Sequence, residues 1–168
     1  MRFLAGVLFG ILLVVLGAAA FLATGSFNVA ATLPPGSVEK QVAAMALSRS
    51  VQRRAPTAKN PLAGSADAVR AGMAHYKEMC VTCHGAPGVD PSEIGEGLNP
   101  PAPDLTLPKV QARTDGQLFW IVQNGIRMTG MPAFGPTHKD EEVWKIVTFL
   151  RHLPELTQEE EKQLKPAE

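Results

Sequence analysis

Cys80-Val81-Thr82-Cys83-His84 is the stretch of sequence that decides how this chain of 168 residues folds. Its two cysteines are the only ones in the chain, and the Cys-x-x-Cys-His spacing is the attachment signature of a c-type haem. Two thiols three positions apart at the end of a helix both reach the vinyl groups of one haem, and the next residue places an imidazole under the iron. The sequence therefore predicts one covalent haem c with its iron, held by Cys80, Cys83 and His84.

Two other interpretations of the cysteine pair need features that the sequence does not show. A thioredoxin-like redox pair would lie in a βαβ unit, and no strand pattern is visible. A zinc site would need further ligands at metal-binding spacing. Haem attachment is therefore the favoured interpretation.

The beginning of the chain is strongly apolar. Residues 3–22 contain no charged side chain and, at the rise of an α-helix, are long enough to cross the hydrocarbon core of a membrane. We expect residues 1–27 to be a retained transmembrane anchor, because the apolar region of a signal peptide is usually about 7–15 residues long. A signal peptide cleaved after Ala18-Ala19-Ala20 is the alternative. Because haem is attached to this motif outside the cytoplasmic membrane, we expect Arg2 to stay inside and the rest of the chain to be exported.

The net charge of the chain is zero, but the charges are unevenly distributed. Residues 1–59 contain six Lys and Arg against one acidic residue, whereas residues 60–168 contain ten Lys and Arg against fifteen acidic residues. The acidic balance of the second part argues against nucleic acid as a partner, because nucleic acid needs a basic face. The acidic balance is compatible with a redox partner whose surface is basic.

Residues 28–61 are predicted to be a basic linker with the pattern of a short helix. Ser37 is the expected N-cap, and a near-helical apolar spacing follows beside several arginines. These residues are Val42, Met45, Ala46 and Val51, with Arg49, Arg53 and Arg54. Two roles remain open, a solvated spacer helix and an element that lies on a surface or binds a partner.

Residues 62–154 are predicted to form one all-α domain around the haem, with a polar tail at 155–168. No strand pattern or internal repeat is visible, and the proline-rich and glycine-rich residues 85–113 predict an irregular wrap around one haem edge. Three core helices follow from capping residues and apolar spacing. One begins at Ser65 and runs into Cys80, one begins at the Thr114 capping box and stops at Asn124-Gly125, and one begins near Thr137 or Lys139 and ends before Pro154.

A second axial ligand to the iron is expected to be a methionine, because a thioether favours reduced iron. Of the six methionines, Met128 and Met131 are the candidates that lie neither in the anchor or linker nor on the helix before Cys80. Gly130 and Pro132 frame Met131, since glycine allows a close approach and proline restrains the backbone. The spacing alone does not separate a ligand from core filler. The remaining histidines are expected at the surface, namely His75, His138 and His152.

Three segments together resemble the class I cytochrome c family, in a monohaem and membrane-anchored form. They are the helix from Ser65 that leads into Cys80-Val-Thr-Cys-His-Gly-Ala-Pro-Gly, the loop Asn124-Gly-Ile-Arg-Met-Thr-Gly-Met-Pro-Ala-Phe-Gly135, and the closing helix Glu142-Val-Trp-Lys-Ile-Val-Thr-Phe-Leu150. The resemblance covers about residues 62–154. It implies a cytochrome c-like fold in which Cys80 and Cys83 carry the thioethers, His84 is the proximal ligand and Met131 the distal ligand.

The resemblance also implies two packing contacts. Gly72 and Tyr76 should cross the final helix near Ile146 and Phe149. The carbonyl of Pro101 or Pro103 should accept the second N–H of the proximal imidazole, and the sequence does not choose between these prolines.

A haem with both axial positions occupied by protein exchanges single electrons through its edge and has no open site for a substrate. The expected function is therefore an electron carrier anchored through residues 3–22 to the outer, periplasmic face of a bacterial cytoplasmic membrane. Its expected partners are a membrane oxidase, a quinol-oxidising complex or a periplasmic dehydrogenase, either as a relay or as a cytochrome subunit of such a complex. The alternative is a haem peroxidase-like enzyme, in which Met131 would have to leave the iron.

Overall fold

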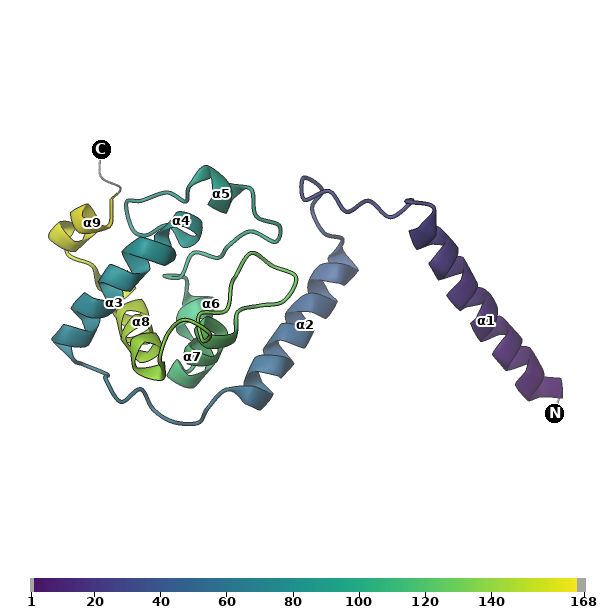
Figure 1. Ribbon diagram of the computed structural model, residues 1–168, viewed down its shortest axis with the longest axis horizontal. Helices are drawn as coiled ribbons and strands as arrows, with labels where there is room; N and C mark the ends of the chain where they lie inside the picture. Colours follow the sequence, from purple (N-terminus) through teal and green to yellow (C-terminus); the bar gives the residue numbers. More distant parts are fainter. Residues whose placement is uncertain (1, 166–168) are drawn as a thin grey trace. The chain divides into compact units, whose positions relative to one another are not determined.

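The computed structural model describes residues 2–165 and is all-helical, with no β-strand within that range. The chain divides into two compact units, with the boundary between Leu33 and Pro34. The first unit contains α1 (Arg2–Ala23). The second contains α2 (Ser37–Arg54), α3 (Ala66–Met79), α4 (Val81–His84), α5 (Glu93–Glu96), α6 (Pro108–Gln111), α7 (Asp115–Asn124), α8 (Asp140–His152), the 3-10 turn Leu153–Glu155 and α9 (Gln158–Leu164) (Figure 1).

Helix α1 confirms the expected apolar segment. Within its 22 residues an 18-residue stretch has a mean hydropathy of 2.7, and among the described residues α1 is the one helix long and apolar enough to cross a membrane. At about 1.5 Å per residue, a helix of this length matches a hydrocarbon core of about 30 Å. Its side chains are exposed throughout, which suits a helix that faces lipid on all sides.

Helix α2 lies within residues 28–61, where a short helix was predicted, but its N-cap differs from the predicted one. Gly36 occupies the N-cap position and Ser37 is the first helical residue, so Ser37 is not the cap. The Glu39 carboxylate accepts the backbone N–H of Gly36 at 3.3 Å. Val51 is completely buried, so the end of this segment packs against the helices that follow.

The chain after α2 is fixed to the domain by two contacts. The carbonyl of Pro56 lies against Gly116 of α7, where a Cβ atom would have no room. The buried amide of Asn60 donates a hydrogen bond to Thr148 Oγ1 of α8 at 2.9 Å. Residues 34–61 therefore belong to the same compact unit as the helices that follow.

The centre of the second unit is the crossing of α3 and α8 (Figure 1). A Cβ atom on Gly72 would collide with the backbone carbonyl of Lys145 and lie 2.8 Å from the Cβ of Phe149, so glycine is what allows the two backbones to approach. One turn later the rings of Tyr76 and Phe149 pack with their centroids 5.2 Å apart. These contacts agree with the predicted helix crossing.

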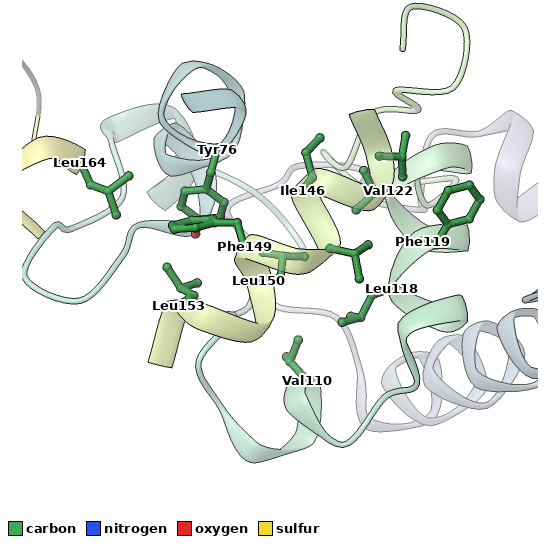
Figure 2. Packing of buried hydrophobic residues seen from close by; sticks show 12 residues of the cluster. Tyr76, Val110, Leu118, Phe119, Val122, Ile146, Phe149, Leu150, Leu153 and Leu164 are labelled. Atoms are coloured by element: carbon green, nitrogen blue, oxygen red, sulfur yellow. The ribbon is translucent and has the colours of Figure 1, made fainter. Parts of the chain in front are cut away.

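The hydrophobic core extends from this crossing to α6, α7 and α9. In Figure 2 the ring of Phe149 lies beside Tyr76 of α3, whereas Val110 of α6 and Leu118 of α7 lie away from it, on the other side of α8. Leu164 of α9 joins the same cluster and is 1% exposed. The tail at residues 155–168, which was predicted to be polar, thus contributes a buried residue to the core.

Arg151 ties the end of α8 to the α6–α7 turn. Its Nε donates to Asp115 Oδ1 at 2.7 Å and its Nη1 to the carbonyl of Gln111 at 2.6 Å, while its Nη2 donates to the carbonyl of Arg113. The predicted Thr114 capping box is present, and Gly125 ends α7 with a φ of 64°. These contacts fix the start of α7, and Gly125 marks the point where the loop that carries Met131 begins.

Candidate haem site

One cleft in the second unit gathers all four residues that the sequence singled out for haem binding. Cys80, Cys83 and His84 line it from the end of α3 and from α4, and Met131 lines it from the loop after α7. The remaining lining is almost wholly apolar and comes from the core helices, from the wrap and from the loop. These residues are Met79, Leu98, Leu105, Val122, Gly130, Pro132, Phe134, Ile146 and Leu150.

The cysteine side of the cleft is built on two consecutive helices. The N–H of Cys80 closes the last turn of α3 on the carbonyl of Tyr76 at 2.9 Å. The carbonyl of Cys80 then accepts the N–H groups of Cys83 at 3.1 Å and His84 at 3.0 Å, which forms the short α4. Burial, with a smaller contribution from Cys83, raises the pKa of the Cys80 thiol to about 12. Both cysteines are free of any disulfide, and a neutral thioether suits these surroundings.

The imidazole of His84 is oriented by the chain of the wrap. Its Nδ1 lies 2.8 Å from the carbonyl oxygen of Pro103, which can only accept, so Nδ1 carries the proton. This leaves the lone pair of Nε2 free to bind a metal. Burial lowers the pKa of His84, and the Pro103 carbonyl opposes this shift only in part. Of the two prolines that the sequence left open, Pro103 makes the contact.

Tyr76 holds the chain that leaves the cysteine motif, a role that sequence reasoning missed. Its hydroxyl donates to the carbonyl of Gly85 at 2.6 Å, and burial raises the pKa of this phenol far above its ordinary value. Gly85 has a φ of 61°, and a Cβ atom there would lie 2.6 Å from the carbonyl oxygen of Val89. The buried Tyr76 hydroxyl thus fixes a turn that only glycine fits.

The loop that carries Met131 is held by backbone hydrogen bonds within the loop and to the end of α7. The N–H of Ile126 donates to the carbonyl of Met131 at 3.1 Å, and the N–H of Phe134 donates to the carbonyl of Val122 at 3.1 Å. Thr129 adds a link of its own, because its Oγ1 accepts the N–H of Met131 at 3.1 Å and donates to the carbonyl of Ile126 at 2.7 Å.

The two candidate methionines have opposite environments. Met131 is partly buried against the core cluster and lines the cleft. Met128 is 90% exposed and has a φ of 60°, which is unusual for a residue other than glycine. Gly130 lies between the two methionines, against the side chain of Leu98. A Cβ atom on Gly130 would lie only 2.5 Å from that side chain. The geometry thus favours Met131 over Met128 as the methionine of the cleft.

The other histidines lie outside the cleft lining. His75 and His138 contact each other with ring centroids 5.5 Å apart, and His152 Nε2 lies 2.9 Å from Glu160 Oε1. Within residues 2–165 no group of three or more His, Cys, Asp and Glu side chains is arranged to hold a metal ion. The zinc interpretation of the cysteine pair therefore finds no further ligands in the part of the chain that the structure describes.

The residues of the cleft fit a covalent haem. Two adjacent thiols are available for thioether bonds, the neutral imidazole has a free nitrogen, and a thioether from a separate segment faces the same apolar space. This donor set is the one that c-type haem uses for attachment and axial coordination. The fold and the cleft together define a c-type cytochrome.

The family comparison agrees with this class. The sequence model of the family described as "Cytochrome C oxidase, cbb3-type, subunit III" matches residues 67–150, half of the chain. The chain belongs to this family of cytochrome c domains. It binds covalent haem c with iron, and its domain serves electron transfer rather than catalysis. A search of curated proteins found no match.

Proposed function

We propose that this chain is a one-electron carrier in which haem c is joined to Cys80 and Cys83 and its iron is bound by His84 and Met131. The observation that carries the proposal is that these four side chains line one apolar cleft from two separate segments of the chain. We propose residues 62–154 as the haem-binding domain. The helical unit around it contributes α2 and α9 as additional packing.

Each proposed ligand has a separate task. Bound haem c supplies a metal that takes up and releases one electron without any change in the protein's covalent structure. Burial favours the neutral imidazole of His84, and the Pro103 carbonyl holds its proton on Nδ1, so Nε2 is available to bind the iron. Met131 presents a neutral, soft sulfur that favours the reduced state of the iron. The apolar lining excludes water and raises the reduction potential of the haem further, because it disfavours the ferric state, which carries one more positive charge.

The proposed location is the periplasmic face of a bacterial cytoplasmic membrane. Helix α1 is compatible with a single-pass anchor, and we propose that it is retained rather than cleaved as a signal peptide. With the haem domain outside, the chain would pass electrons to or within a membrane oxidase complex, as the description of its family suggests. A quinol-oxidising complex or a periplasmic dehydrogenase would supply the electrons.

No observation favours the peroxidase-like alternative. A peroxidase needs an open axial position on the iron, whereas Met131 is held beside the cleft by the Thr129 hydrogen bonds and by the end of α7.

Spectroelectrochemistry of the full-length protein tests the proposed function. We expect one reversible transition with the slope of a one-electron couple, and no spectral change when carbon monoxide is added to the reduced protein, because both axial positions are taken. A reduced protein that binds carbon monoxide at once would contradict the proposal and would favour an open-site enzyme.

A further inference from the structure

The two ends of α2 have different surroundings. Near its C-terminus, Val51 is fully buried and the chain that follows packs against α7. From Ser37 to Ala46, every residue is exposed. A helical segment of this length has little stability of its own in water. The N-terminal half of α2 is therefore a helix that lacks a packing partner among the described residues.

The large apolar residues of this half lie on one stripe. Val38, Val42 and Met45 follow each other at helical spacing and are 72%, 53% and 60% exposed. Arg49 and Arg53 continue the same stripe toward the C-terminus, and both are exposed. We call these five residues the outer stripe. Val51 lies on a different side of the helix, and its burial against the domain leaves the outer stripe free.

The charge of this region suits an anionic surface. Residues 37–59 contain five Lys and Arg and one acidic residue, whereas residues 60–168 are acidic on balance. A helix with exposed apolar side chains followed by arginines has the composition of an element that lies in the interface of an anionic membrane. Arginine side chains near such a surface are attracted by the phosphate groups of the lipids.

The covalent connection keeps α2 near a membrane. Residues 24–36 join it to α1 and span at most about 45 Å when fully extended. The connection contains the exposed apolar side chains of Phe27, Val29 and Leu33, which also suit a membrane interface. When α1 spans a bilayer, α2 cannot leave the neighbourhood of its surface.

We propose that the outer stripe of α2 binds the anionic phospholipid surface of the bilayer that α1 spans. Val38, Val42 and Met45 enter the headgroup region, and Arg49 and Arg53 contact lipid phosphates. Because α2 also packs on α7, this contact holds the haem domain at the membrane in one orientation. The proposal rests on the retained anchor and is independent of which residues bind the iron.

Thiol protection in lipid nanodiscs tests this contact. Cys80 and Cys83 are consumed by the haem, so Met45→Cys in the full-length holoprotein provides a single free thiol. The matched control is Ala43→Cys, an exposed position on the other side of the same turn. The rate of reaction with a water-soluble maleimide is measured in discs of phosphatidylcholine alone and in discs that also contain phosphatidylglycerol.

We expect phosphatidylglycerol to slow the labelling of Met45→Cys roughly tenfold, the factor that corresponds to about 1.4 kcal/mol, and to leave Ala43→Cys nearly unchanged. Introducing Arg49→Glu and Arg53→Glu into the Met45→Cys protein should abolish the protection by phosphatidylglycerol. Introducing Arg54→Glu, on another side of α2, should preserve it. Equal labelling in both lipids would overturn the proposal. Protection that arises only after a purified oxidase is added would overturn it in favour of a protein partner.

The haem spectrum of each variant separates this test from the proposed function. An unchanged spectrum together with unprotected Met45→Cys would refute the lipid contact and leave the electron carrier intact. A variant that spans the disc and is protected, but whose iron lacks the methionine ligand, would support the lipid contact and contradict the proposed ligation.

Discussion

The two sides of the haem cleft are built by different means. Cys80 ends α3, which packs through Gly72 and Tyr76 against α8, and Cys83 and His84 lie on α4, which follows α3 directly. Met131 lies on a loop that is held by a few backbone hydrogen bonds and by Thr129. The cysteine side thus continues a helix of the hydrophobic core, whereas the methionine side is a loop packed against that core. We therefore expect changes on the cysteine side to affect the whole domain and changes on the methionine side to affect mainly the iron.

The largest effect is expected from removing the two thiols. Cys80→Ala with Cys83→Ala should abolish covalent haem, because thioether bonds cannot form and no other cysteine is present. Denaturing gels stained for haem should show no colour on the polypeptide. Thr82→Ala, an exposed position between the cysteines, is the control and should keep its colour. Colour that persists in the double variant would show that the haem is attached elsewhere.

The helix crossing is the next most sensitive point. Gly72→Val should destabilise the domain by about 1–3 kcal/mol, because the added side chain collides with the Lys145 carbonyl. The melting temperature should fall by several degrees while the covalent haem remains. Ala74→Val, on the exposed side of α3, is the matched control and should change the melting temperature little. A Gly72→Val protein as stable as the original would show that α3 and α8 do not cross at Gly72.

A smaller, local effect is expected on the methionine side. Thr129→Val removes a hydroxyl that links Met131 to Ile126, at a cost of about 1 kcal/mol, or roughly fivefold in the opening of the loop. Cyanide should therefore bind the ferric protein several times faster, with little change in the melting temperature. Thr57→Val, at an exposed position outside the cleft lining, should leave the rate unchanged. Faster cyanide binding in both variants would show that the effect is not specific to Thr129.

The smallest effect concerns the pH dependence of the α9 contact. The backbone N–H of Thr157, with smaller contributions from the Thr157 hydroxyl and His152, lowers the pKa of Glu160. A carboxylate whose pKa is lowered by folding stabilises the protein above its ordinary pKa of about 4.3, and this stabilisation is lost as the pH falls through the lowered value. The difference in melting temperature between the original protein and Glu160→Gln should therefore shrink as the pH falls below about 4. A difference that does not depend on pH would contradict the role of the ionised carboxylate.

The helices around the cysteine side of the cleft could be predicted because the information for them is local. The Cys80–His84 motif, the Ser65 cap and the Thr114 capping box each specify structure within a few residues, and the last two are present as predicted. Gly72 could be placed at a helix crossing because the resemblance to class I cytochromes c supplied its partner helix.

What the sequence could not predict depends on the path of the chain in space. Pro101 and Pro103 have similar sequence surroundings, and only the folded wrap brings the Pro103 carbonyl to His84. Leu164 lies in a polar segment, and its burial follows from the turn at Leu153–Glu155 that returns α9 to the core. The burial of Val51 likewise depends on α7, which lies far along the chain.

The choice of the distal ligand is the central claim, and the ferric near-infrared spectrum tests it most directly. A methionine sulfur on ferric haem gives a weak sulfur-to-iron band in this region, and Met131 lines the cleft while Met128 is 90% exposed. We predict that Met131→Ala abolishes this band and opens the reduced iron to carbon monoxide, whereas Met128→Ala does neither. The reverse pattern, or a band that survives in Met131→Ala, would contradict the account.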